Sequence, residues 1–168
     1  MLLMMPTSTS PRSLVRTAVL CAALGLTSAS AYAQSAPFAG MAGVWSGNGT
    51  ISLEDGSKER IRCKATYAVS GDGAGLNQSL LCASDSYKFE LKSDVKARGG
   101  ELSGSWAETT RGVTGSLEGR ATAGKFNVDV SSPAFSAKLI LTTTGNKQQV
   151  SITSEGQFRG ASISLSRS

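Results

Sequence analysis

The sequence predicts an all-β fold in which an antiparallel up-and-down meander of about eight to ten strands closes into a barrel. Three observations lead to this prediction. From Gly43 onward, apolar and polar residues alternate over segments that are separated by Gly, Asp, Asn, Ser or Pro. Short turns between these segments keep the apolar residues of neighbouring segments on one face. The other face is polar, and no segment after Gly43 has the 3.6-residue period of a helix that could cover the apolar face.

The first 33 residues have the features of a secretory signal peptide. Arg12 and Arg16 form a basic start, and the apolar run 17–26 is too short to span a bilayer as a helix. Ala31-Tyr32-Ala33 has the small-x-small pattern of a signal peptidase site. We therefore expect a cleaved signal peptide over residues 1–33, a lead-in over 34–42 and a single barrel domain over 43–168. The expected compartment is the bacterial periplasm, with secretion as the alternative.

Cleavage would leave 135 of the 168 residues, which is enough for one domain with a hydrophobic core. The loss of two arginines lowers the formal net charge from +5 to +3, so the charge does not favour nucleic acid as a partner. Cys63 and Cys82 are then the remaining cysteines. In an oxidising compartment they are predicted to form a disulfide, and two unpaired buried thiols are the alternative.

Ten sets of residues share the apolar face, one set for each predicted strand. In chain order they are Trp45, Ile51 and Leu53; Ile61, Cys63, Ala65, Tyr67 and Val69; Leu76, Leu80 and Cys82; Tyr87, Phe89 and Leu91; Leu102 and Trp106; Val113 and Leu117; Phe126, Val128 and Val130; Phe135, Ala137, Leu139 and Leu141; Val150 and Ile152; and Ala161, Ile163 and Leu165.

Hairpin register gives a sharper test than alternation, because both members of a cross-strand pair must lie on one face. The predicted two-residue turns are Asp72-Gly73, Ser84-Asp85, Gly99-Gly100, Thr110-Arg111, a turn near Thr122-Ala123, Ser132-Pro133, Gly145-Asn146 and Gly156-Gln157, and the first connection is a three-residue loop, Asp55-Gly56-Ser57. These turns place Cys63 opposite Cys82, Val130 opposite Phe135 and Trp45 opposite Tyr67. A two-residue turn would make the cysteines a hydrogen-bonded pair with Cα atoms about 5.5 Å apart, and a longer loop would change this.

The two faces differ in composition. Seven of the eight aromatic residues after residue 40 lie on the apolar face, and Phe158 is the exception. The polar face carries Lys58, Arg60, Arg62, Lys64 and many Ser and Thr residues. This polarity is the reverse of an outer-membrane barrel, so we expect a soluble barrel that does not span a membrane. A two-sheet β-sandwich is the alternative, because alternation is common to both folds.

Gly43-Val44-Trp45, at the start of the first strand, resembles the Gly-x-Trp signature of the calycin group, which includes the lipocalins. In that group the tryptophan closes one end of the barrel, and an arginine from the last strand packs across it. The resemblance implies a calycin-like barrel and gives this role to Arg159 or Arg167, of which Arg167 is nearer the end of the last strand. Ten strands depart from the eight of lipocalins. More broadly, the chain resembles small exported bacterial proteins of unassigned function.

No catalytic or metal-binding motif stands out. The chain has no histidine, and therefore lacks the usual general base and the imidazole metal ligand. Glu108 is the acid that falls on the apolar face, near a strand end, and we interpret it as a rim residue rather than a general acid. We expect no enzymatic activity, no cofactor and no metal.

The candidate ligand-binding residues are the inward aromatics Trp45, Tyr67, Tyr87, Phe89, Trp106, Phe126 and Phe135. They either fill an ordinary core or line a pocket in which Gln78, Ser93 and Ser154 could serve as polar anchors. Our leading hypothesis is that the barrel binds a small apolar or amphipathic ligand. The alternative is a non-catalytic envelope structural or protein-interaction module with a filled core. The stripe Lys58, Arg60, Arg62 and Lys64 is interpreted as a solvated face, or else as a surface for an anionic envelope component.

Overall fold

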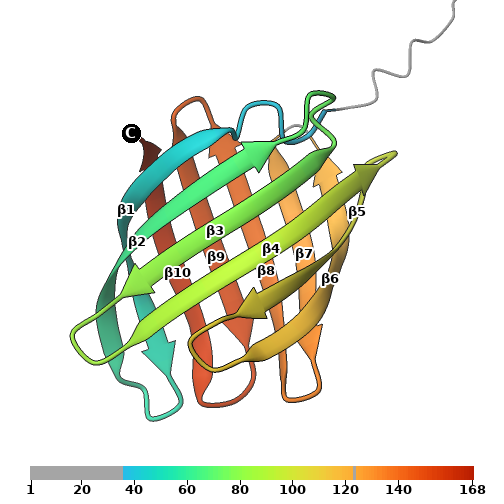
Figure 1. Cartoon of the computed structure of the whole chain (residues 1–168). Coiled ribbons are helices and arrows are strands. Elements are labelled where there is room, and N and C mark those ends of the chain that lie inside the picture. Colours follow the sequence, from blue (N-terminus) through green and yellow to red (C-terminus); the bar gives the residue numbers. More distant parts are fainter. Residues whose placement is uncertain (1–35, 123) are drawn as a thin grey trace, which may run out of the picture. The chain divides into compact units, whose positions relative to one another are not determined.

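The computed structural model describes residues 36–122 and 124–168. The predicted signal peptide 1–33 and the expected mature start at Gln34 lie outside the described residues. The described part forms a continuous run of antiparallel strands joined by short turns (Figure 1). The strands are β1 (Gly43–Leu53), β2 (Lys58–Val69), β3 (Gly75–Ala83), β4 (Lys88–Arg98), β5 (Glu101–Glu108), β6 (Val113–Thr122), β7 (Lys125–Ser132), β8 (Phe135–Thr144), β9 (Lys147–Ser154) and β10 (Phe158–Arg167). None of the residues described forms a helix with the length and apolar character of a membrane span.

The sheet closes on itself. Each strand pairs with its neighbours in the sequence, and β1 also pairs with β10, where Trp45 lies opposite Arg167. This arrangement of ten strands confirms the predicted all-β meander of about eight to ten strands closed into a barrel and excludes the sandwich. Closure gives every strand two partners, so the sheet has no free edge.

Side-chain alternation along the strands separates the interior from the surface. In β2, Ile61, Cys63 and Ala65 are buried, and the residues between them are exposed. At inward positions such as Gly47 and Gly115, glycine lets neighbouring strands approach closely. A Cβ atom on Gly47 would lie 1.9 Å from the carbonyl oxygen of Ser164, and one on Gly115 would lie 2.0 Å from that of Ser131. Larger residues would therefore push the strands apart at these positions.

Five of the nine predicted connections have the predicted register. These are the turns at Asp72-Gly73, Gly99-Gly100, Thr110-Arg111, Gly145-Asn146 and Gly156-Gln157. At the second of them, Gly99 and Gly100 have φ values of 60° and 86°. Both values are left-handed, as a type I′ hairpin turn requires.

The turn predicted near Thr122-Ala123 follows Thr122, which pairs with Lys125. The other three predicted positions are wrong. Ser84 pairs with Tyr87 and Ser132 with Phe135, so these two turns lie one residue later than predicted. The first loop is Glu54-Asp55-Gly56, one residue earlier than predicted, since Leu53 bonds to Ser57. Consequently Val130 lies opposite Ala137 rather than Phe135, and Trp45 lies opposite Ala65 rather than Tyr67. Each displacement moves the register by two residues and keeps every side chain on its face, so alternation cannot detect it.

The predicted disulfide between Cys63 and Cys82 is present, with a Cα–Cα distance of 4.1 Å. The hydrogen-bonded pairing expected from a two-residue turn is wrong. The Ser70 N–H donates to the carbonyl oxygen of Gly75 (2.9 Å), so the loop spans residues 71–74. The longer loop shifts the hydrogen-bond ladder by one position and makes the cysteines a closely spaced, non-hydrogen-bonded pair.

A β-bulge in β10 turns Phe158 inward. Ser52 pairs with Gly160 and Leu53 pairs with Phe158, which leaves Arg159 as the extra residue. The extra residue reverses the alternation, so Phe158 packs against the core. The prediction that Phe158 lies on the polar face is wrong, because counting back from Ala161 assumes an uninterrupted strand.

Candidate functional site

Trp45 lies near the start of β1, opposite Arg167, at the end of the barrel where the C-terminus lies in Figure 1. We call this the closed end. The Trp45 side chain is fully buried, and its Nε1–H donates to the carbonyl oxygen of Met41 (2.8 Å). The Arg167 guanidinium lies 4.5 Å from the Trp45 ring centroid and donates hydrogen bonds to the carbonyl oxygens of Gly40 and Ala42. Arg167 therefore has the role that the calycin resemblance assigned to it.

The lead-in before β1 completes this closed end. Phe38 and Met41 are buried, and the Phe38 ring stacks on Phe126 with ring centroids 5.6 Å apart. The Phe38 N–H also donates to the carbonyl oxygen of Gly73 (3.2 Å). Sequence reasoning assigned no packing role to residues 34–42. The large apolar residues Phe38 and Met41, which stand among small residues, could have indicated that this segment packs on the barrel.

Above this floor the barrel encloses a cavity of about 720 Å³. Leu102, Phe126 and Leu165 near the closed end are buried. At the other end, Phe89 and Phe135 also point inward and line the cavity but are only half-buried. The cavity therefore opens to solvent at the end opposite Trp45, which we call the mouth. The connections β1–β2, β3–β4, β5–β6, β7–β8 and β9–β10 surround it (Figure 1).

Six of the seven predicted ligand-binding aromatics line this cavity: Tyr67, Tyr87, Phe89, Trp106, Phe126 and Phe135. Trp45 does not, because it lies within the closed end. Phe38 and Phe158, which sequence reasoning left out, line the cavity as well. Phe135 has its ring centroid 6.2 Å from that of Trp106 and 6.3 Å from that of Phe158. These three rings, from β5, β8 and β10, form an aromatic cluster near the mouth.

The inward polar side chains bond to other groups of the protein. Ser93 Oγ donates to Gln78 Oε1 (3.0 Å), and Ser154 Oγ donates to the carbonyl oxygen of Ser136 (2.8 Å). Gln148 is fully buried and accepts a hydrogen bond from the Tyr67 hydroxyl (3.2 Å). Burial raises the pKa of Tyr67, and the bond to Gln148 offsets part of that rise. Among the described residues, every buried side-chain nitrogen or oxygen has a partner.

Glu108, the last residue of β5, and Arg111, in the turn between β5 and β6, lie at the mouth. The Glu108 side chain is only 3% exposed, and its carboxylate accepts hydrogen bonds from the backbone N–H groups of Glu90, Thr110 and Arg111 and from the Thr110 hydroxyl. Burial raises the pKa of this carboxyl, but the hydrogen bonds outweigh burial and lower the pKa to about 2. Glu108 is thus an ionised structural residue of the rim.

The Arg111 guanidinium, in the turn between β5 and β6, contacts the neighbouring turn between β3 and β4. It lies 4.4 Å from the Tyr87 ring centroid, and its Nη1 is 3.5 Å from Glu108 Oε2. The Arg111 side chain is 44% exposed, so part of it faces solvent. A cation next to an apolar opening can meet the polar end of a bound molecule.

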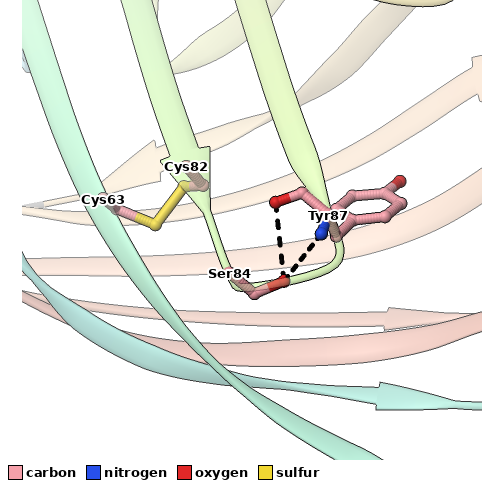
Figure 2. Close-up of a disulfide and its surroundings, with 4 residues drawn as sticks. All are labelled: Cys63, Cys82, Ser84 and Tyr87. Atoms are coloured by element: carbon pink, nitrogen blue, oxygen red, sulfur yellow. Dashed lines mark hydrogen bonds between the residues drawn. A yellow bond between two sulfur atoms is a disulfide. The ribbon is translucent and has the colours of Figure 1, made fainter.

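The disulfide fixes the wall of the mouth beside Tyr87. Cys82 lies one residue before the end of β3, and Ser84 and Tyr87 bound the turn that follows (Figure 2). Ser84 Oγ accepts a hydrogen bond from the Tyr87 N–H (3.0 Å). The bond between Cys63 and Cys82 therefore ties to β2 the hairpin that presents Tyr87 to the cavity.

Comparison with known proteins shows the fold alone. No protein-family model and no curated protein sequence matches the chain. Among solved structures, it is similar to Rv2717c from M. tuberculosis, with a TM-score of 0.63 and 12% identity over 77% of this chain and 94% of that one. It is also similar to the S-type phycobiliprotein lyase CPES from Guillardia theta, with a TM-score of 0.58 and 10% identity over 78% of this chain and 90% of that one. These likenesses and the closed ten-strand barrel fit a calycin-like fold.

Proposed function

We propose that the protein is an exported, non-enzymatic barrel that binds a small apolar or amphipathic ligand in its interior. The supporting observation is the cavity of about 720 Å³, which is lined by apolar side chains and open at one end. Its volume falls within the range of roughly 300–1,000 Å³ that is typical of small-molecule sites. In a filled core, inward residues such as Phe89 and Phe135 would be buried rather than half-buried.

The polarity of the cavity supports an apolar ligand body. Since Ser93 bonds to Gln78 and the Tyr67 hydroxyl bonds to Gln148, a polar group deep in the cavity would lose its water and find few free partners. The polar end of an amphipathic ligand could stay at the mouth, beside Arg111. We expect such a ligand to enter apolar end first.

A non-enzymatic role is supported by the state of Glu108, the buried carboxylate beside the cavity. Its oxygens already accept four hydrogen bonds, and its lowered pKa keeps it ionised, so it is a poor general acid. One of the structurally similar proteins is named a lyase. Chemical conversion of a bound ligand by the purified protein would overturn this part of the proposal.

Export to the periplasm, or secretion, is supported by the signal-peptide features of residues 1–33 and by the disulfide. We propose 34–42 as the lead-in and 43–168 as the barrel domain of the mature chain. The proposal requires the protein isolated from the periplasm to begin at Gln34. A mass that includes residues 1–33 would contradict it.

Titration with an apolar fluorescent dye tests the binding function. We expect saturable binding at micromolar dye and quenching of Trp106 fluorescence, because Trp106 lines the cavity. Val150→Trp fills the cavity from β9 and should weaken dye binding at least ten-fold. Ser151→Trp adds the same residue to the outer face of the same strand and should leave binding unchanged. Absence of binding to the wild-type protein would favour the alternative, a structural or interaction module with a filled core.

A further inference from the structure

Charged residues are distributed unevenly over the outside of the barrel. The outward positions of β2 and β4 carry two carboxylates, Glu90 and Asp94, but eight cations: Lys58, Arg60, Arg62, Lys64, Lys88, Lys92, Lys96 and Arg98. The outward positions of β5–β9 are nearly balanced, with Arg120, Lys125, Lys138 and Lys147 against Glu101, Glu118 and Asp129. Those of β1 carry no charge. We call the outer surface of β2–β4 the basic face.

The basic face has two rows of cations with an uncharged strand between them. β3 pairs with β2 on one side and with β4 on the other, and the three strands lie side by side at the front of Figure 1. The outward residues of β3 are uncharged, and Leu81 among them is 42% exposed. Along β2 the cations follow one another at about 6.8 Å, whereas along β4 Glu90 and Asp94 alternate with the lysines, and the two rows are about 9.6 Å apart.

Most of these cations are not neutralised by the protein. Within residues 36–122 and 124–168, Lys88 is the member of the basic face that forms an ion pair, with Glu90 (2.6 Å), and the other seven form none. Like charges at this spacing repel one another. An external anionic partner would relieve that repulsion.

We propose that the basic face docks on a membrane surface that contains anionic phospholipids. A flat surface that touches β3 can reach the charged rows on both sides, while Leu81, between Lys64 and Glu90 near the mouth end of β3, contacts the interfacial region. A linear polyanion would need only one row of cations and no apolar contact, so the arrangement favours a membrane. Docking through the wall of the barrel leaves the mouth free. The proposal does not depend on ligand binding.

Vesicle co-sedimentation tests the proposal, with soluble protein recovered from cells that express the full 168-residue chain. We expect binding to vesicles of phosphatidylcholine with 30% phosphatidylglycerol, set here as roughly a typical anionic-lipid content, and none to pure phosphatidylcholine. Salt should weaken the binding, because the charges involved are exposed. Loss of each cation should lower the partition coefficient about five-fold, so the double variant Arg62→Gln/Lys64→Gln should lower it about 25-fold.

A matched control separates a local site from net charge. Lys125→Gln/Lys147→Gln removes the same charge from β7 and β9, outside the basic face, and should leave vesicle binding within about two-fold of the wild type. Leu81→Ser should weaken vesicle binding without changing its salt dependence. Three outcomes would overturn the proposal: equal losses in both double variants, no binding to anionic vesicles, or binding to heparin and not to vesicles.

Discussion

Glu108 is a buried carboxylate whose hydrogen bonds depend on its being ionised. The folded-state pKa of Glu108, lowered to about 2, lies below the ordinary glutamate pKa of 4.5, so the ionised side chain stabilises the fold above the unfolded-state pKa. That stabilisation, about 3 kcal/mol for such a shift, is lost as the pH falls towards 2. We predict that Glu108→Gln lowers the melting temperature clearly at pH 7. The difference from the wild type should shrink between pH 4.5 and pH 2.

Thermal melts of both proteins across this range check the prediction. An equal difference at pH 7 and pH 2.5 would show that the ionised state of Glu108 has no special role. Trp45→Phe, far from Glu108 at the closed end, serves as a control, because its effect should depend little on pH in this window.

The neighbours of Gly115 leave no space for a side chain at this position. A Cβ atom there would lie 2.0 Å from the carbonyl oxygen of Ser131 and 2.6 Å from the Trp106 ring. We predict that Gly115→Ala destabilises the fold by about 2 kcal/mol or more, as overpacking does. Gly71→Ala is the matched control, since a Cβ atom at Gly71 meets nothing within 4 Å. Urea unfolding measures the free energy of unfolding of the two variants. Equal values would contradict the claim that the close approach of β7 at Gly115 requires glycine.

Some single-residue roles could be predicted from the sequence, and others could not. The Gly-x-Trp resemblance pointed to Trp45 and Arg167 because that motif is local. Arg111 carries no local signal, since its role comes from the ring of Tyr87, a residue on a different hairpin.

At the scale of strands and turns, the alternation predicted which side chains face inward but not the full register. A displacement by two residues leaves alternation intact, which is why the turns at Ser84-Asp85 and Ser132-Pro133 were misplaced. The bulge at Arg159 has the opposite effect, because one extra residue exchanges the two faces. Phe158 therefore could not be placed without the partner strand.

The disulfide between Cys63 and Cys82 is a covalent cross-link between β2 and β3. It joins cysteines 19 residues apart on adjacent strands, next to the hairpin that carries Tyr87. We predict that the double variant Cys63→Ser/Cys82→Ser lowers the free energy of unfolding by about 3 kcal/mol, the size expected for a loop of this length. Urea unfolding of the variant and of the reduced wild-type protein measures the loss. A midpoint unchanged by reduction would mean that the disulfide does not stabilise the fold.

At the scale of the whole molecule, the closed barrel follows from one apolar face on every strand and the absence of a helix to cover it in the described part of the chain. The sequence left open whether the barrel was filled. Whether the interior is filled depends on how much of the barrel volume the side chains of all ten strands occupy. It also depends on the closure of one end by Phe38 and Met41. Both are properties of the assembled barrel, so no single segment reveals them.

The central claim, that the barrel carries a ligand in its cavity, is tested most directly by the intact mass of the protein from the periplasm. The protein is purified without denaturant, incubated with a total membrane lipid extract and measured under native and denaturing conditions. We predict a small-molecule adduct that is present natively, lost on denaturation and absent from Val150→Trp. A native mass equal to the denatured mass, in the wild type and the variant alike, would contradict the claim.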